Sequence, residues 1–108
     1  MTPNALRATE TPTAMTAKEI RALERLLEVA QNDTGQSRRV ADFLLAWWNA
    51  GECGAWDPTD LWSLDTDLGE AIVIVLGYML RARLYPDKLG FADEFKALVR
   101  QWRRPPSD

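Results

Sequence analysis

Histidine is absent from this chain of 108 residues. Its absence excludes the commonest general base and the commonest metal ligand, and with them every Ser-His or Cys-His nucleophile pair. The single cysteine, Cys53, excludes an internal disulfide framework and a multi-thiolate metal site. Cys53 stands beside Glu52 and close to Asp57, and a thiol among acids is a poor nucleophile. Few residues remain for covalent or acid-base chemistry, and we expect a protein that is not an enzyme.

Cofactor-binding motifs are also missing. The sequence contains neither a phosphate-binding glycine loop nor a dinucleotide-binding fingerprint. The segment DTDLGE at residues 65–70 has some of the oxygen spacing of a calcium loop, but its fifth position is Gly69 and its sixth is Glu70 where glycine is required. Helix capping is a simpler explanation of Asp65 and Asp67. We predict no metal and no cofactor.

Long apolar runs are absent as well. The longest, AIVIVLGYML at residues 71–80, has ten residues, about half of what a bilayer-spanning helix needs. The first fifteen residues lack the apolar region of a signal peptide, and a single cysteine suits a reducing compartment. We therefore expect a soluble, cytoplasmic protein without membrane binding.

The length of the chain predicts one domain. Residues 1–15 lack periodicity and contain two prolines, which predicts a disordered tail, and Met15 could equally be the native start. Residues 105–108 predict a second, loose tail. The folded domain is expected at residues 16–104.

Apolar side chains recur at helical spacing through that domain. Helices are predicted at residues 17–31, 36–49, 66–84 and 91–103, with a short one starting at Pro58. The run at 71–80 is apolar on nearly all sides, which predicts the buried centre of the fold. Its β-branched residues 72–75 also allow a buried strand, but the charged and capped flanks favour helix. The expected fold is all-α, a compact bundle of four main helices plus one short helix around a central apolar helix.

Helix ends carry their usual signals. Thr16 and Glu19 have the spacing of a capping box. Gly51 is the expected C-terminal glycine of the second helix. Asp57 is the expected cap of the short helix, with Pro58 at its first position.

Tryptophan is abundant, with five in the chain. Tryptophan fills cores and is also enriched at hot spots of protein interfaces. Trp47 and Trp48 point about 100° apart on one helix, so the two indoles are not expected to share a pocket. One should be a core residue, and the other needs a different neighbour or solvent. The sequence leaves open homodimerisation through Trp48 or Trp102.

Charge is distributed unevenly, although the net charge is only −3. Residues 40–80 contain no Lys or Arg but seven acids. Six of these acids, with two tryptophans, predict a surface that docks onto a basic protein while the charges steer the encounter. The candidate partner-binding residues are Glu52, Trp56, Asp57, Asp60, Trp62, Asp65, Asp67 and Glu70. The alternative is that these acids only cap helices and solvate a loop.

Arginines at the ends of the predicted helices offer a second interpretation. They could contact phosphates, which would make the chain a nucleic-acid-binding accessory protein of conjugation or element maintenance. A pI near 4.9 is low for such a protein, so direct nucleic-acid binding is not favoured, and we expect these arginines to pair with the acidic segment. The arginines concerned are Arg38, Arg39, Arg100, Arg103 and Arg104.

Three segments of the chain resemble a known family. They are DTGQSRRVADFLLAWWNA at residues 33–50, Asp60-Leu61-Trp62 and Tyr85-Pro86-Asp87. They resemble a family of small proteins of unknown function encoded on integrative and conjugative elements and plasmids of proteobacteria, over about residues 17–102. The family carries no established activity or site residues. The resemblance implies a setting as cargo of a mobile element, where small acidic proteins often bind and disable host defence machinery. We expect a non-enzymatic protein-binding module, with an anti-CRISPR-like inhibitor of a nucleic-acid-handling complex as its most specific form.

Overall fold

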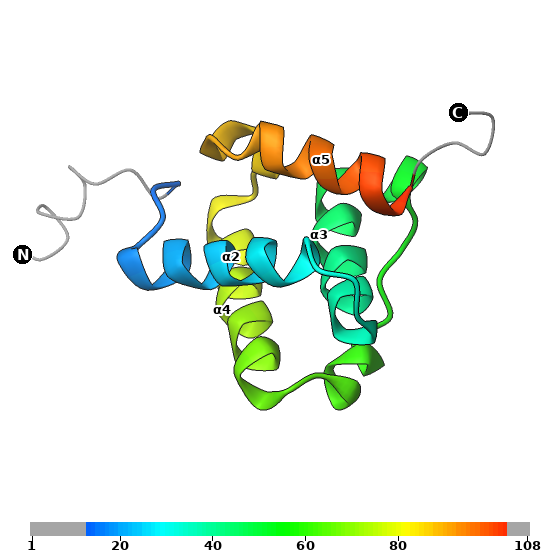
Figure 1. The fold of residues 1–108 in the computed structure, drawn as a ribbon. Helices are drawn as coiled ribbons and strands as arrows, with labels where there is room; N and C mark the ends of the chain where they lie inside the picture. The colour runs from blue at the N-terminus through cyan, green and yellow to red at the C-terminus, as the bar shows by residue number, and fades with distance from the viewer. Residues whose placement is uncertain (1–12, 104–108) are drawn as a thin grey trace, which may run out of the picture.

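The computed structural model describes residues 13–103, which form four α-helices and two 3-10 helices with no strand among them (Figure 1). Helix is therefore confirmed over the β-branched residues 72–75, and the all-α prediction is confirmed with it. Residues 1–12 and 104–108, which include most of both predicted tails, lie outside the described residues. The elements are α2 (Ala17–Ala30), α3 (Gly35–Cys53), η1 (Pro58–Ser63), α4 (Thr66–Ala82), η2 (Pro86–Leu89) and α5 (Ala92–Trp102).

Helix α2 begins with the capping box that its sequence predicts. The Thr16 hydroxyl oxygen accepts a hydrogen bond from the Glu19 amide at 3.1 Å, and the Glu19 carboxylate accepts one from the Thr16 amide at 2.9 Å. These two bonds satisfy amides that the first helical turn leaves without partners. The helix then presents one apolar face, on which Leu23 and Leu26 are fully buried.

The position of α2 organises the fold. It crosses α3 and α4 in front, as Figure 1 shows, and packs against both. Helix α5 lies across one end of this layer and packs on α3. The core therefore sits beneath α2, where Leu23 meets fully buried residues of the other helices such as Leu44 and Ile72.

Helix α4 is not the buried centre that its apolar run predicts. Its buried residues follow one stripe, from Leu68 to Ala82 at helical spacing. On the opposite face Val73 is 58% exposed and Leu80 is 74% exposed. The physical reason is the size of the domain, because α2 covers one face of α4 and the described residues supply no further α-helix to cover the other.

Helix α3 runs past its predicted end but is broken there. Asn49 leaves the helical conformation, with φ −168° and ψ 85°, and its side-chain oxygen accepts a hydrogen bond from the Glu52 amide at 3.2 Å. Asn49 therefore ends one helical segment and caps the single turn that follows. The terminal glycine is Gly54, with φ 95°, and not Gly51 as the sequence predicts.

The adjacent indoles of α3 meet the same ring of α5. Trp47 packs edge to face against Phe95, with ring centroids 6.0 Å apart, and donates a hydrogen bond from Nε1 to the Leu84 carbonyl at 2.9 Å. Trp48 stacks on Phe95 at 5.4 Å with nearly parallel planes. The expectation that the two indoles keep separate neighbours is wrong, because Phe95 is large enough to contact both.

The C-terminal end of α5 is tied to α2 and α3 by polar contacts. The Trp102 Nε1 atom donates to the Ala30 carbonyl at 2.9 Å. Arg103 donates to the Cys53 carbonyl at 2.7 Å and forms an ion pair with Asp42. The prediction that this arginine pairs within the chain is confirmed.

Helix α4 ends at a residue in the left-handed conformation, Arg83, with φ 58° and ψ 43°. This conformation disfavours residues other than glycine by about 1 kcal/mol. We predict that Arg83→Gly raises the free energy of unfolding by about 0.5–1 kcal/mol, because glycine removes the strain of the left-handed conformation. The greater conformational entropy of glycine in the unfolded chain offsets only part of this stabilisation. Urea denaturation followed by circular dichroism measures the change.

The matched control is Arg100→Gly, the same replacement at an exposed right-handed position inside α5. It should lower the free energy of unfolding by about 1 kcal/mol. Equal effects from the two variants would contradict the conformational argument.

Candidate functional site

The short helix η1 is built by its own side chains. The Asp57 carboxylate accepts hydrogen bonds from the Thr59 amide at 2.9 Å and the Thr59 hydroxyl at 2.8 Å, and Pro58 occupies the first helical position. The Thr59 amide is the main reason that the pKa of Asp57 lies below its usual value, and the Thr59 hydroxyl adds to it. The predicted capping role of Asp57 is therefore confirmed. These bonds hold the next turn, with Leu61 and Trp62, beside α4.

An open groove of about 740 Å³ lies between η1 and the first half of α4. Its apolar lining comes from Leu61, Trp62, Leu64, Val73 and Ile74, and its polar lining from Lys18, Thr66 and Glu70. Gly69 faces Leu61 across this contact, and a Cβ at this position would lie at an ordinary van der Waals distance of 3.9 Å from Leu61 Cδ2. The groove is larger than the hollow of about 560 Å³ that lies beside Trp48 and Tyr85.

Trp62 is the most exposed large side chain at this groove. Its indole is 84% exposed, although tryptophan usually buries most of its surface. An exposed indole beside an apolar groove is typical of a surface that another molecule covers.

The acids of the predicted site differ in their surroundings. Glu70 lines the groove, and Asp65 is exposed at the start of α4 without the side-chain capping bond that its sequence predicts. Asp65 is instead held through its amide, which donates to Gln36 Oε1 at 2.7 Å. Asp67 and Asp60 carry arginine partners, Arg25 at 3.5 Å and Arg39 at 3.9 Å.

Two predicted site residues lie apart from the groove lining. Trp56 is half-buried and packs edge to face on Phe43 at the margin of the core, with centroids 5.0 Å apart. Its Nε1 atom is buried without a hydrogen-bond partner among the described residues. Glu52 is exposed in the single turn after Asn49, outside the groove.

Sequence patterns alone did not identify Leu61, Leu64, Val73 and Ile74 as groove residues. Their signal is the apolar character of α4 on nearly all sides, which leaves one face uncovered when a single helix packs on it. A count of acids in the sequence also overestimates the negative charge of the site, because Asp60 and Asp67 are partly neutralised by ion pairs with arginines.

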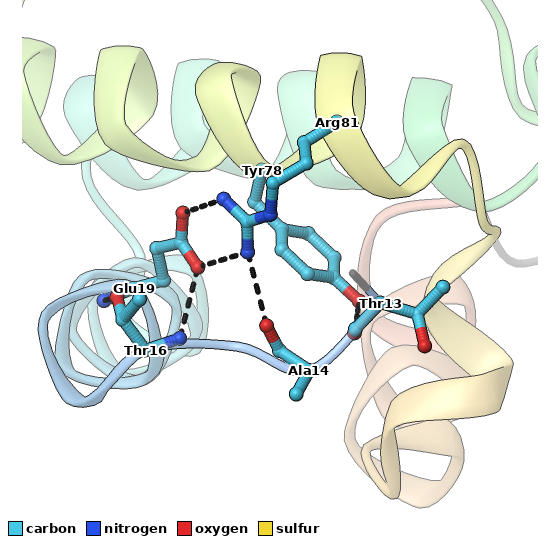
Figure 2. Close-up of polar contacts among 6 residues, drawn as sticks. All are labelled: Thr13, Ala14, Thr16, Glu19, Tyr78 and Arg81. Carbon is cyan, nitrogen blue, oxygen red and sulfur yellow. Dashed lines mark hydrogen bonds and ion pairs between the residues drawn. The ribbon is translucent and has the colours of Figure 1, made fainter. Parts of the chain in front are cut away.

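A cluster of charged residues near the C-terminal end of α4 is the second candidate (Figure 2). Arg81 holds the Glu19 carboxylate through two hydrogen bonds of 2.8 Å each, from Nη1 and Nη2. Arg81 also donates to the Ala14 carbonyl at 3.0 Å, and the Tyr78 hydroxyl donates to the Thr13 carbonyl at 2.5 Å. The folded part of the chain therefore begins before Thr16, since these contacts hold the end of the predicted tail against α4.

The Glu19 cluster has the perturbed acidities that are typical of active sites. The hydrogen bonds from Arg81 lower the pKa of Glu19 from 4.5 to about 2, and burial raises the pKa of Tyr78. The groups that shift these pKa values also have a structural task, because Glu19 accepts bonds from Arg81 and Thr16 at once. We interpret the cluster as a clamp that joins α2 to α4.

Other kinds of site were sought in the described part of the chain. No group of three or more acidic or thiol side chains there is arranged to hold a metal ion. No helix within residues 13–103 is long and apolar enough to cross a membrane. Cys53 is buried and has a free thiol.

Removing the charge of Glu19 tests the clamp. We predict that Glu19→Gln lowers the free energy of unfolding at pH 7 by about 2 kcal/mol, less than its full pKa shift implies because the Arg81 side chain is 40% exposed. Glutamine keeps the bond to the Thr16 amide, so the loss reports the ion pair. The folded-state pKa is depressed, so the stabilisation is complete above about pH 5 and disappears as the pH falls from 4.5 towards 2. Urea denaturation at several pH values measures it.

The matched control is Glu28→Gln on the same helix, whose carboxylate is 72% exposed and pairs with Arg25. It should change stability by less than about 0.5 kcal/mol. If wild type and Glu19→Gln lost stability equally between pH 5 and pH 2, and differed at pH 7 by no more than the control, the clamp would have no energetic role.

Comparison with known proteins places the chain in a family. A family model of unknown function, DUF7673, matches residues 20–103, which includes all four described α-helices except the first turn of α2. No curated protein and no solved structure shows significant similarity to the chain. The match agrees with the resemblance to a family without known activity, and by it the chain belongs to the family of unknown function DUF7673.

Proposed function

We propose that this chain is a non-enzymatic protein-binding module, and that the groove between η1 and α4 receives an apolar side chain of a basic partner protein. The observation that carries the proposal is Trp62, 84% exposed at the edge of an apolar groove. A tryptophan that becomes buried on binding contributes more than most residues to an interface. The groove supplies aliphatic walls against which a partner side chain can pack.

The charge around the groove supports a basic partner. Asp65 and Glu70 have no ion pair among the described residues, while Asp60 and Asp67 are only partly neutralised by exposed or half-exposed arginines. Lys18 is the one base in the lining. A surplus of negative charge around an apolar groove accelerates encounter with a positive surface and disfavours acidic competitors.

The same charges disfavour nucleic acid as the ligand. Phosphates would be repelled by the groove, and two of the arginines considered for phosphate contact are engaged elsewhere, Arg103 with Asp42 and Arg39 with Asp60. Proteins that handle nucleic acids carry basic channels, so we propose such a complex as the partner. The mobile-element setting implied by the family resemblance makes an anti-defence inhibitor the specific form of this proposal, in a reducing cytoplasm that suits the free Cys53.

Substitution of Trp62 tests the proposal. Full-length wild-type chain and Trp62→Ser are used as baits in a lysate of the host, and the proteins that the wild type retains are purified for titration calorimetry with both baits. We predict that Trp62→Ser lowers the affinity for the partner by at least tenfold, because the interface loses a buried indole. Stability should be unchanged, since the side chain is exposed in the free protein.

Charge reversal gives a second measurement on the same partner. Asp65→Lys and Glu70→Lys change acids that make no ion pair and no capping bond in the described residues, and should slow association and reduce its dependence on salt. Glu94→Lys on α5 is the control, since it is exposed and outside the groove. Equal affinity of wild type and Trp62→Ser for every retained protein would overturn the proposal.

A further inference from the structure

A second hollow, of about 560 Å³, lies at the break in α3 and shares no residue with the groove. One wall is the helix around Asn49, with Trp48 before it and Ala50 and Gly51 after it. The other wall is the segment that joins α4 to α5, which contributes Tyr85 and Asp87. Small side chains on the helix leave the space open between the two aromatic residues.

The two aromatic side chains of the hollow are held differently. Trp48 is fixed by its stacking on Phe95, with centroids 5.4 Å apart and planes inclined by 14°. Tyr85 is 68% exposed, so its ring is open to solvent. Aromatic faces attract cations, and tryptophan and tyrosine do so most strongly.

The backbone of α3 adds negative potential at the same place. Because Asn49 leaves the helical conformation, the hydrogen-bond ladder that starts at Gly35 is interrupted here. The carbonyl groups of the preceding turn, to which Ala46 belongs, are at the negative end of a helical segment. The single turn after Asn49 is too short to supply an opposing dipole of similar size.

The charged lining of the hollow has the same sign. Asp87 contributes a carboxylate, and no Lys or Arg side chain lines the space. An anion would therefore meet a carboxylate and a helix C-terminus together. A bare metal ion would find one carboxylate and no cluster of three ligands among the described residues.

We propose that this hollow binds an alkylammonium group, either as a free quaternary amine or as a lysine side chain of a protein. Trp48 and Tyr85 contact the alkyl groups and the delocalised positive charge. The positive charge is balanced by the Asp87 carboxylate and by the carbonyl groups at the end of the helical segment before Asn49. The site is separate from the groove, and its occupancy does not depend on the proposed function.

Tetramethylammonium chloride is the first probe, added to uniformly ¹⁵N-labelled full-length chain with sodium chloride of equal ionic strength as the reference. We expect a saturable shift of the Trp48 Nε1–H signal and of the amides near Asn49 and Tyr85. Trp62 is the internal control, because it is exposed and outside the hollow. A Trp48 signal that does not move, or that moves in parallel with Trp62, would overturn the proposal.

Substitutions at the hollow test its two kinds of contact. Tyr85→Ala and Asp87→Asn should each weaken the tetramethylammonium affinity about two- to fivefold, whereas Tyr85→Phe should preserve it because the ring face remains. Both positions are exposed, so the amide spectrum should keep its folded pattern. Unchanged affinity in both Tyr85→Ala and Asp87→Asn would overturn the assignment.

A second probe distinguishes the two sources of the cation. The blocked tripeptide Gly-Lys-Gly carries a primary alkylammonium group on a peptide backbone. Tighter binding of this peptide than of tetramethylammonium supports a lysine of a protein partner, and the reverse order supports a free quaternary amine. Trp62→Ser should leave the affinities for both probes unchanged. A wrong proposal for the groove would therefore not alter the binding measured at the hollow, and a wrong proposal for the hollow would not alter partner binding at the groove.

Discussion

The clamp between Glu19 and Arg81 sets the geometry on which the rest of the fold depends. It joins the first turn of α2 to the last turn of α4 with two hydrogen bonds of 2.8 Å. The same carboxylate closes the capping box, so one side chain fixes both the start of the helix and its position on its neighbour. With α2 held there, its apolar face covers α3 and α4 together, and burial of side chains such as Leu23 and Leu26 contributes about 1.5–3 kcal/mol each.

That arrangement explains why the surface offers two concave regions. A single helix covers one face of α4, so the opposite face keeps Val73 in solvent and η1 can close a groove against it. The second region lies at the break at Asn49, between α3 and the segment that joins α4 to α5. One region is apolar with an acidic surround, and the other is aromatic with a carboxylate. Both therefore favour ligands that carry positive charge.

The candidate site could be predicted from the sequence only in part. Trp62 and Glu70 lie at the groove, as expected of an acidic segment that bears tryptophan. Trp56 belongs to the same segment but packs on Phe43. Sequence distance does not indicate which of two nearby indoles meets the core. The arginines that share the charge of Asp60 and Asp67 come from α2 and α3, which no local pattern connects to them.

The sequence by itself determined what depends on neighbours along the chain. The capping box at Thr16, the Asp57 cap of η1 and the helical periodicity are satisfied within a few residues, so they could be derived without the fold. Only the tertiary structure decided which face of α4 stays exposed and which carboxylates keep an unshared charge. These outcomes depend on how helices distant in sequence cross. Because α4 is apolar on nearly all sides, its sequence contains no local signal that indicates which side α2 leaves uncovered.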